Sequence, residues 1–475
     1  MINPIALSGS YSEQMDVVCQ ASEGILYQQR GTLIRIRDNQ IDTLTATSLQ
    51  SHLIDHMTPV TQKLTKDGDV IEVPQKKFER DLCQHLIDRT QIDLQELEYV
   101  YRCPVFDEDM VVYSEHGYHP TCKAWLNTKD LGFIEPMPIP EAKGLLDDLL
   151  CDFPFADEAS RTNAMMALIT PFIRPAVGLM PLFLITAPSE GSGKTLLAEI
   201  VGMISDGVHA EKMIAPSNDD EWRKRISSSL ADSPSVIIID NVEDLDAPSL
   251  AAALTSKIWT DRILGSTKNM SVPNRAVWFA TGNNPTVSAE MSRRCVPIRL
   301  VPATERPADR PFRHTDIERY VIENRTQLVR AAMSLVYHWV MAGKPLVDVT
   351  MGSYQVWATI AASVICSHGY TGALDNRASL RTDEDDELRA FIEIWAKNPQ
   401  ARKCATARDL ESMCRDDDGD WLASVRGSSL HTGARSRRVS AYIAGKVDRI
   451  YGCWKICRSQ DSHSKAVTFY LESLK

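Results

Sequence analysis

A short glycine-rich run lies between an apolar segment and a segment of good helix formers. The apolar segment covers residues 182–185, and the run ends at Gly193, Lys194 and Thr195. A loop of this kind between a strand and a helix directs backbone N–H groups at phosphate oxygens, and the helix N-terminus adds its positive dipole. The lysine then reaches the β- and γ-phosphates, and the hydroxyl holds Mg²⁺. The sequence therefore predicts a triphosphate site at Pro188, Glu190, Gly191, Ser192, Gly193, Lys194 and Thr195.

This loop departs from the usual phosphate-binding pattern at its first position. The pattern begins with a glycine five residues before Gly193, where this chain has Pro188. Proline fixes a turn but has no N–H to donate, so the entry to the loop must differ in detail. The alternative is a glycine-rich turn with a chance lysine. Three segments further along the chain favour the phosphate-binding interpretation.

The first of these segments is a run of four β-branched residues, 236–239, followed by Asp240. The pattern predicts a buried parallel strand with a carboxylate at its C-terminal edge, where open α/β sheets bind ligands. Asp240 is the expected Mg²⁺ partner of Thr195. Many ATPases place Glu directly after this Asp to orient the attacking water, whereas this chain has Asn241. Glu243 is our first choice for that role.

The second segment is another apolar strand, 276–280, which ends in polar residues that include Asn283 and Asn284. An asparagine at a strand tip beside the loop can bond the γ-phosphate or the attacking water. The sequence does not distinguish between these two asparagines. A plain turn is the alternative, because Gly-Asn-Asn-Pro is also a turn sequence.

The third segment places Arg293 and Arg294 directly before a short predicted strand, 295–300. Planar guanidinium groups stabilise the charge of a phosphoryl group in transfer. The pair suits a finger that reaches into the nucleotide site of a neighbouring subunit. A solvated pair of surface arginines is the alternative.

The composition is that of an ordinary globular protein, with 44% hydrophobic and 24% charged residues in 475. This length allows about two to four domains. The net charge of −11 is unevenly spread, because residues 422–475 contain ten Lys or Arg and three acids, or about +7. A basic segment in an acidic protein favours contact with nucleic acid.

Eleven scattered cysteines and the absence of a signal peptide predict reduced thiols in a cytoplasmic protein. Cys103, His116, His119 and Cys122 match no common zinc-finger spacing, and a tight turn explains the segment better. Residues 163–187 are apolar, but three prolines and an arginine interrupt them. A core helix, a loop and a strand are expected there rather than a membrane span.

Three features predict the elements that position these residues. Residues 135–140 are proline-rich and typical of a linker, 316–342 have the period of one long amphipathic helix, and an acidic run, 383–387, precedes another helix. We expect an N-terminal α+β domain over 1–140, an α/β nucleotide-binding core over 141–310, a helical lid over 311–383 and a winged-helix DNA-binding domain over 384–475.

Two further patterns indicate contact with DNA. A hairpin predicted over 262–274 carries Lys268, which would track a DNA backbone. Near the C-terminus a helix with a basic stripe precedes alternating strands over 454–456 and 467–471, which is typical of a winged helix on duplex DNA. Solvated surface charge is the alternative in both places. The expected contacts to duplex DNA are Arg437, Arg438, Lys446 and Arg449.

The four segments together resemble the AAA+ replicative helicases of phages, plasmids and integrated mobile elements, the superfamily-3-like group. The likeness lies in residues 187–195, 236–241, 281–284 and 293–294. It implies a P-loop AAA+ core that uses ATP and Mg²⁺. It also implies a homo-oligomer, expected to be a hexamer, that moves on DNA in replication initiation. Single-stranded DNA would lie in the channel, and a separate primase is a possible partner.

Two other functions share these features. One is a nucleotide-switched DNA-binding factor that assembles or loads other proteins without unwinding DNA. The other is an ATPase of a mobile element that acts in defence. A motor needs both a channel contact, here Lys268, and a trans-acting finger, here Arg293 or Arg294.

Overall fold

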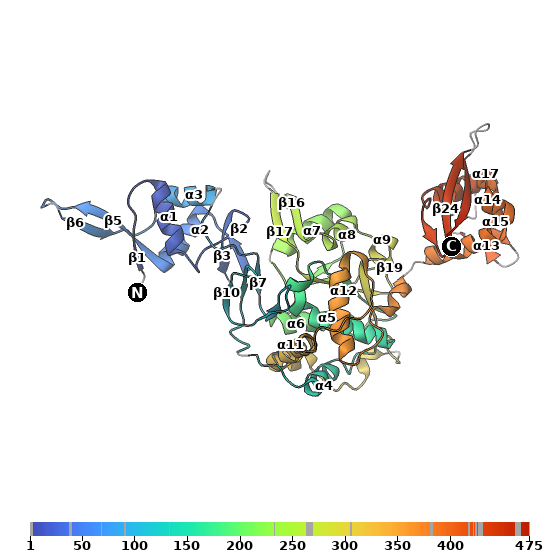
Figure 1. The fold of residues 1–475 in the computed structure, drawn as a ribbon, viewed down its shortest axis with the longest axis horizontal. Helices are drawn as coiled ribbons and strands as arrows, with labels where there is room; N and C mark the ends of the chain where they lie inside the picture. Colours follow the sequence, from blue (N-terminus) through green and yellow to red (C-terminus); the bar gives the residue numbers. More distant parts are fainter. Residues whose placement is uncertain are drawn as a thin grey trace. The chain divides into compact units, whose positions relative to one another are not determined.

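A five-stranded parallel sheet lies at the centre of the larger of two units in the computed structural model (Figure 1). The strand order is β13-β14-β18-β12-β20, so β18 lies between β12 and β14. Four of the strands are buried, mostly apolar runs, as is typical of a parallel sheet covered on both faces, whereas the edge strand β13 is mostly exposed. Their bounds are β12 Leu182–Ala187, β13 Glu211–Ile214, β14 Val236–Asp240, β18 Val277–Asn283 and β20 Cys295–Arg299.

The structure describes most of the chain, and its contacts divide the chain into two units. One unit holds residues 1–286 and 290–379, and the other holds 287–289 and 380–475. The expected boundaries at 140 and 310 both lie inside the first unit. The described residues are 3–37, 40–67, 69–89, 92–132, 134–231, 233–262, 269–304, 306–380, 383–416, 419–420, 422, 425, 431–460 and 467–474.

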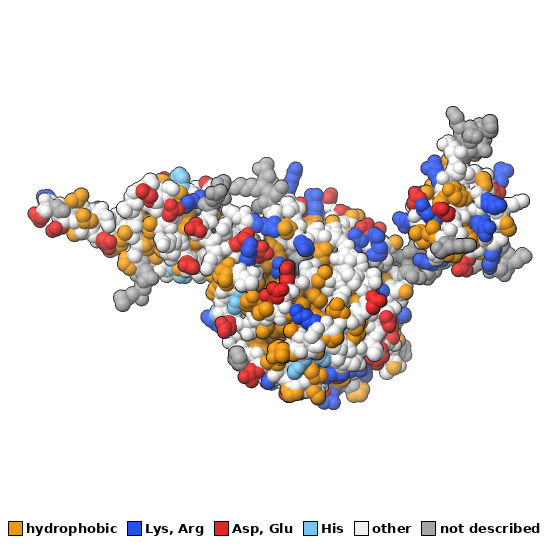
Figure 2. All heavy atoms as spheres, viewed as in Figure 1, with side chains coloured by type: hydrophobic (Ala, Val, Ile, Leu, Met, Phe, Trp, Pro, Cys, Tyr) orange, Lys and Arg blue, Asp and Glu red, His pale blue; other side chains and the backbone are white. Residues whose placement is uncertain are grey.

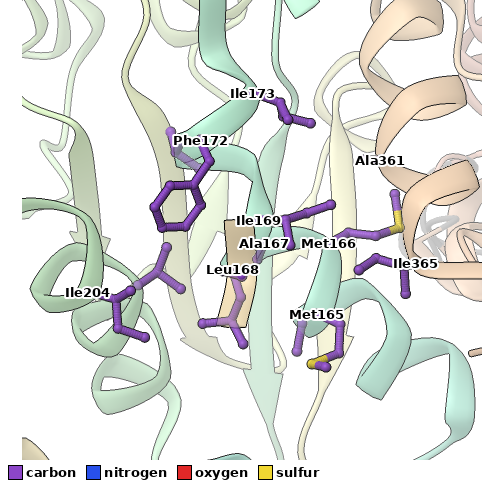
Figure 3. Close-up of a cluster of buried hydrophobic side chains, with 14 of the residues drawn as sticks. Met165, Met166, Ala167, Leu168, Ile169, Phe172, Ile173, Ile204, Ala361 and Ile365 are labelled. Carbon is purple, nitrogen blue, oxygen red and sulfur yellow. The ribbon is translucent and has the colours of Figure 1, made fainter. Parts of the chain in front are cut away.

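Alternate residues of the strands pack on one hydrophobic core, which centres on helix α5 (Glu158–Val177). Almost every side chain of α5 is buried, as expected for a helix that is apolar all round. Figure 3 shows its side chains gathered with Ile204 of α6 (Lys194–Asp206) and with Ala361 and Ile365 of α12 (Gln355–Ser367). The apolar stretch over 163–187 is thus a core helix, a loop and β12. Among the described residues, every helix is too short or too polar to cross a membrane.

The segment before the sheet contains small sheets and short helices. Two three-stranded sheets, β1-β5-β6 and β2-β3-β4, are followed by the sheet β10-β11-β7 and the pair β8-β9. The helices are α1 Tyr11–Ala21, α2 Ala46–His56 and α3 Arg80–Asp88. The strands are β1 Asn3–Ala6, β2 Tyr27–Gln29, β3 Thr32–Arg37, β4 Gln40–Thr43, β5 Met57–Leu64, β6 Val70–Pro74, β7 Tyr99–Tyr101, β8 Val105–Phe106, β9 Val112–Tyr113, β10 Gly117–His119 and β11 Ala124–Leu126.

The proline-rich segment before residue 140 is part of the packed structure rather than a free linker. Met137 is buried, and its N–H donates to Ser334 Oγ at 2.8 Å. Ser334 belongs to α11 (Arg325–Met341), against which α4 (Ile139–Leu149) packs. Because these contacts join the segment to the core, the chain does not divide at this position.

The long helix expected over 316–342 is two helices, α10 (Ile317–Glu323) and α11. Asn324 between them has φ −106° and ψ 12°, outside the helical region. Its side chain donates to the carbonyl of Tyr320 at 2.9 Å. Asparagine competes in this way with the helical backbone, and a periodicity of apolar residues does not record that competition.

The remaining elements between α6 and β20 connect the strands of the sheet, and two of them, β19 and α9, include residues assigned to the second unit. The hairpin predicted over 262–274 is present as the antiparallel pair β16–β17, whose tip, 263–268, lies outside the described residues. The bounds are α7 Asp219–Ala231, α8 Pro248–Leu254, α9 Ala289–Ser292, β15 Asp244–Leu245, β16 Ile258–Arg262, β17 Asn269–Pro273 and β19 Thr286–Val287.

The second unit has helices and an antiparallel sheet, β23-β24-β25, around its own core. Trp395, Val439 and Phe469 come from different elements and meet in this core. The acidic run 383–387 lies within the first helix rather than before it, at the end where the helix dipole favours negative charge. The bounds are α13 Asp383–Lys397, α14 Pro399–Lys403, α15 Ala407–Met413, α17 Thr432–Ala444, β21 Arg415–Asp416, β22 Gly419–Asp420, β23 Ile450–Tyr451, β24 Trp454–Gln460 and β25 Val467–Ser473.

The central position of α5 gives a stability prediction. Leu168 is 1% exposed in the core, whereas Leu346 is 69% exposed. Replacing Leu168 with Ala removes buried apolar volume and should lower the free energy of unfolding by about 2–5 kcal/mol. Leu346→Ala should change it by less than about 0.5 kcal/mol. Equal effects of the two variants in denaturant unfolding would contradict this placement of α5.

Candidate functional site

The loop between β12 and α6 depends on two glycines with positive φ. Gly191 has φ 71° and Gly193 has φ 90°, a region that glycine occupies without steric cost. Gly193 is the N-cap of α6, and a Cβ at this position would lie 3.2 Å from the Phe153 ring. The first N–H groups of a helix have no partner within the helix. The start of α6 therefore offers donors to an anion in the loop.

Lys194 is the first residue of α6, and its side chain crosses back over the loop. Its ammonium donates to the carbonyl of Ser189 at 3.1 Å and to Asn283 Oδ1 at 2.7 Å. Partial burial lowers the pKa of Lys194, and the carboxylates of Glu190 and Asp240 oppose that change. Asn283, at the tip of β18, is thus the asparagine that the structure brings to the lysine.

Asp240 ends β14 and joins the loop helix to the neighbouring strand. Its Oδ1 accepts from Thr195 Oγ1 at 2.7 Å and from Thr281 Oγ1 at 2.6 Å. Hydroxyl and carboxylate oxygens are the ligands that Mg²⁺ prefers, so the donor set at Thr195 and Asp240 fits that ion. Thr281 was not among the residues predicted for the site. Its place at the polar tip of a strand beside the loop could have indicated this role.

A close approach of two backbones sets the position of the β18 tip. The N–H of Val242 donates to the carbonyl of Thr281 at 2.7 Å. A Cβ on Gly282 would lie 2.4 Å from the carbonyl oxygen of Val242, so any larger residue would push the strands apart. Asn241 and Asn284 beside this contact have φ 54° and 46°, which asparagine tolerates better than most residues.

The other residues predicted for this site lie at the surface. Pro188, Glu190 and Glu243 are exposed, and Asn284 is exposed next to Asn283. The carbonyl of Glu243 accepts from the N–H of Thr286 at 3.0 Å, which fixes its backbone. Among the described residues, the side-chain contacts of Lys194 and Asp240 do not include Glu243. Its role in orienting water stays a prediction.

The two arginines differ in their surroundings. Arg294 is 17% exposed and forms an ion pair with Glu290 at 3.1 Å, and it also donates to the Glu290 carbonyl at 2.7 Å. Arg293 has an exposed side chain, and its carbonyl accepts from Arg377 at 3.4 Å. The structure therefore holds Arg294 against its own chain and leaves the Arg293 side chain at the surface.

A cavity of about 220 Å³ opens beside the glycine-rich loop. Phe153, Leu196 and Ile317 give it an apolar lining next to Gly191–Gly193, and Asp152 and His314 add polar groups. A mostly apolar cavity with a few polar groups is typical of a small-molecule site. The cavity thus lies directly against the glycine-rich loop.

The residues predicted to contact DNA belong to two places. Lys268 lies outside the described residues, in the tip of the β16–β17 hairpin. Arg437, Arg438 and Arg449 are exposed, whereas the ammonium of Lys446 lies 4.8 Å from the Tyr442 ring centroid. Figure 2 shows Lys and Arg side chains on the visible face of the second unit.

Two basic residues of the second unit already form ion pairs with carboxylates of the same unit. Arg435 lies 2.9 Å from Glu411, and Lys455 lies 2.9 Å from Asp448. Arg435 and Lys455 are therefore less available to a partner than unpaired cations, although the net charge of about +7 over 422–475 already counts Asp448. A sequence alone records the charges but not which of them are paired.

The four residues weighed for zinc do not form a metal site in the described structure. All eleven cysteines are free, and Cys103 is fully buried. The Cys122 thiol donates to the carbonyl of His119 at 3.7 Å, and the His116 ring packs on the edge of Trp125. Among the described residues, the His, Cys, Asp and Glu groups close enough to share an ion do not include these four.

No protein-family model matches the chain, and no curated protein matches it. Among solved structures, the A-form apo structure of the C-terminal region of NrS-1 (305–718) has a TM-score of 0.42 at 12% identity and covers 94% of this chain and 96% of that chain. A second structure of that region has a TM-score of 0.41 at 12% identity, with 94% and 95% covered. The X-ray structure of JCV helicase has a TM-score of 0.25 at 11% identity, with 54% and 66% covered. These similarities are distant in both sequence and structure.

Proposed function

We propose that this chain is an ATP-hydrolysing DNA motor, a helicase of a mobile genetic element that works as a ring, expected to be a hexamer. One observation carries the ATPase part: the start of α6 is hydrogen-bonded to the ends of both neighbouring parallel strands. Lys194 bonds Asn283 of β18, and Asp240 of β14 accepts from Thr195 and Thr281. These are the groups that bind a triphosphate, hold Mg²⁺ and contact the γ-phosphate. The mostly apolar cavity beside the loop is where the nucleoside of the proposed ATP would bind.

The residues take separate parts in hydrolysis. Lys194 donates to the β- and γ-phosphate oxygens, and the N–H groups at the start of α6 donate to the same charge. Thr195 and Asp240 would hold Mg²⁺, and the ion would neutralise charge on the phosphate oxygens. Asn283 already accepts from Lys194 through Oδ1. Its amide N–H₂ group is then available to donate to the γ-phosphate or to the attacking water.

The first test removes the lysine. Lys194→Ala should lower ATP turnover by roughly 10²-fold or more. A fixed donor at the transferring phosphoryl group lowers the activation barrier by about 3 kcal/mol, and the variant loses that stabilisation. Lys63→Ala, an exposed lysine of β5, should keep wild-type turnover. Steady-state ATPase rates check this, with circular dichroism to show that both variants fold. Wild-type turnover in folded Lys194→Ala protein would refute the assignment of the loop.

The arginine pair gives a test of shared sites. Arg293 is the finger in this proposal, because its side chain is exposed while Glu290 holds Arg294. Arg293→Ala protein should have little ATPase activity by itself and should regain part of it when mixed with Lys194→Ala protein. Where the two variants meet, one chain supplies an intact Lys194 and the other an intact Arg293, so one site at that interface is complete. Arg294→Ala mixed in the same way should show no such gain. Co-assembly without rescue of Arg293→Ala would argue against a finger supplied by a neighbour.

The second unit supports duplex DNA as a partner. Its order of α13, α15, α17 and the hairpin β24–β25 follows that of a winged helix, with α17 as the candidate groove helix and the hairpin as the wing. Arg437 and Arg438 are exposed on α17, and Arg449 is exposed just beyond it. Guanidinium groups at such positions contact phosphates, which fix the position of a protein on DNA without reading its sequence.

Salt dependence measures these contacts. Each phosphate contact contributes about 0.9 to the slope of log K against log salt, so replacing Arg437, Arg438 and Arg449 together with Ala should flatten the slope by up to roughly 3 units. Arg319→Ala, an exposed arginine paired with Glu323 in the other unit, serves as the control. Fluorescence anisotropy with labelled duplex DNA at several salt concentrations gives the slope for the triple variant and for the control. An unchanged slope in the triple variant would remove the DNA-binding role of α17.

A motor must also couple ATP turnover to strand separation. Single-stranded DNA should raise the ATPase rate, and a forked duplex should be unwound in the presence of ATP and Mg²⁺. ATP turnover without unwinding would contradict the motor. The same nucleotide site would then belong to a nucleotide-switched DNA-binding assembly factor or an element-encoded defence ATPase.

A further inference from the structure

Three side chains of metal-binding type meet beside the nucleotide cavity. Asp148 is in α4, Cys151 is in the turn that follows, and His314 precedes α10. One carboxylate oxygen, the thiol sulfur and one ring nitrogen of these residues all lie within 4.8 Å of one another. Cys151 is exposed, and Asp148 and His314 are half-buried, so an ion from solvent can reach the group.

The polypeptide around His314 holds its ring in this position. The carboxylate of Asp152 accepts the backbone N–H groups of Arg313 at 3.1 Å and His314 at 3.0 Å. The imidazole Nε2 lies 2.9 Å from Asp148 Oδ2, and the ring packs on Tyr320 with 4.0 Å between centroids. Two segments more than a hundred residues apart in sequence are thus fixed against each other with their donor atoms together.

The two oxygens of the Asp148 carboxylate have different partners. Arg313 lies 2.5 Å from Asp148 Oδ1, which leaves Oδ2 on the side of the histidine. A bound divalent ion would replace the contact between Asp148 Oδ2 and the imidazole. In tetrahedral zinc sites the donor atoms lie roughly 3.3–3.8 Å apart, as bond lengths of about 2.0–2.3 Å require. The three donors, which lie within 4.8 Å of one another, would have to adjust to that spacing when an ion binds.

We propose that Asp148, Cys151 and His314 form a zinc site, with solvent as the fourth ligand. A thiolate with an imidazole and a carboxylate suits a borderline ion such as Zn²⁺, whereas Mg²⁺ and Ca²⁺ take oxygen ligands. Because His314 and Asp152 also line the cavity beside the loop, bound zinc would clamp the cavity wall to the end of α4. Zinc binding itself does not depend on the proposed ATPase function.

A second group in the same unit provides a matched control. Glu199, His209 and Glu318 also have donor atoms within 4.8 Å of one another. Its carboxylate Glu199 pairs with the Lys212 ammonium at 2.5 Å, as Asp148 pairs with Arg313 at 2.5 Å, so the two groups match in this respect. They differ because the control group lacks a thiol. His209→Gln should therefore leave zinc binding unchanged.

The first experiment measures zinc binding by the full chain, freed of metal and titrated against a chromogenic chelator. Wild-type protein should bind zinc tightly, and Cys151→Ser and His314→Gln should each weaken binding by on the order of 10²-fold. Cobalt in place of zinc should give a thiolate charge-transfer band that Cys151→Ser loses. Zinc affinity equal in wild type, Cys151→Ser and His314→Gln, or no binding by wild type, would overturn the proposal.

The second experiment needs no substitution. Cys151, Cys404 and Cys453 are all exposed, so each should react with iodoacetamide in the metal-free chain. Zinc should protect Cys151 from alkylation, as read by peptide mass spectrometry, and leave Cys404 and Cys453 reactive. Equal reactivity of Cys151 with and without zinc would overturn the site even if zinc binds elsewhere.

Discussion

The Asp240 carboxylate is the interaction on which the arrangement of the site depends. One of its oxygens accepts from Thr195 at the start of α6 and from Thr281 on β18. Three separate elements, β14, β18 and α6, are thereby fixed within hydrogen-bond distance of one another. The contact is possible because β18 lies between β12 and β14, so its tip can reach both the loop and Asp240. The lysine contact of Asn283 follows from the same strand order.

The other end of the loop helix is fixed as firmly as its start. Arg325, at the start of α11, is buried and donates to the carbonyls of Ile204 and Ser205, which are close to the C-terminal end of α6. The same guanidinium donates to the carbonyl of Arg102 and pairs with Asp130 at 2.5 Å. A buried charge is tolerated where it is hydrogen-bonded in this way. A shift of α6 would therefore move α11 and the segment before the sheet together.

Local patterns predicted the elements of the site, and long-range contacts decided among its residues. Each of three elements follows from a local run of residue types. They are the strand–loop–helix at Lys194, the strand that ends at Asp240 and the β16–β17 hairpin. Strand order depends on pairing between distant segments, so the sequence left it open. The choice of Asn283 over Asn284 depends on that order. The Glu290 contact of Arg294 and the break at Asn324 depend on single side-chain hydrogen bonds, which residue periodicity does not record.

The charge at the proposed nucleotide site explains why a neighbouring chain would be needed. A triphosphate brings roughly four negative charges, and charge on the transferring group must be stabilised for hydrolysis to be fast. Lys194 and a Mg²⁺ ion would supply about three positive charges, of which the Asp240 carboxylate offsets one. Glu290 holds Arg294 within its own chain, while Arg293 is exposed beyond the strand end. In the proposed motor, an exposed guanidinium of one chain would add positive charge to the site of the next, so hydrolysis would become fast only after assembly. Such a dependence would couple ATP turnover to the oligomeric state.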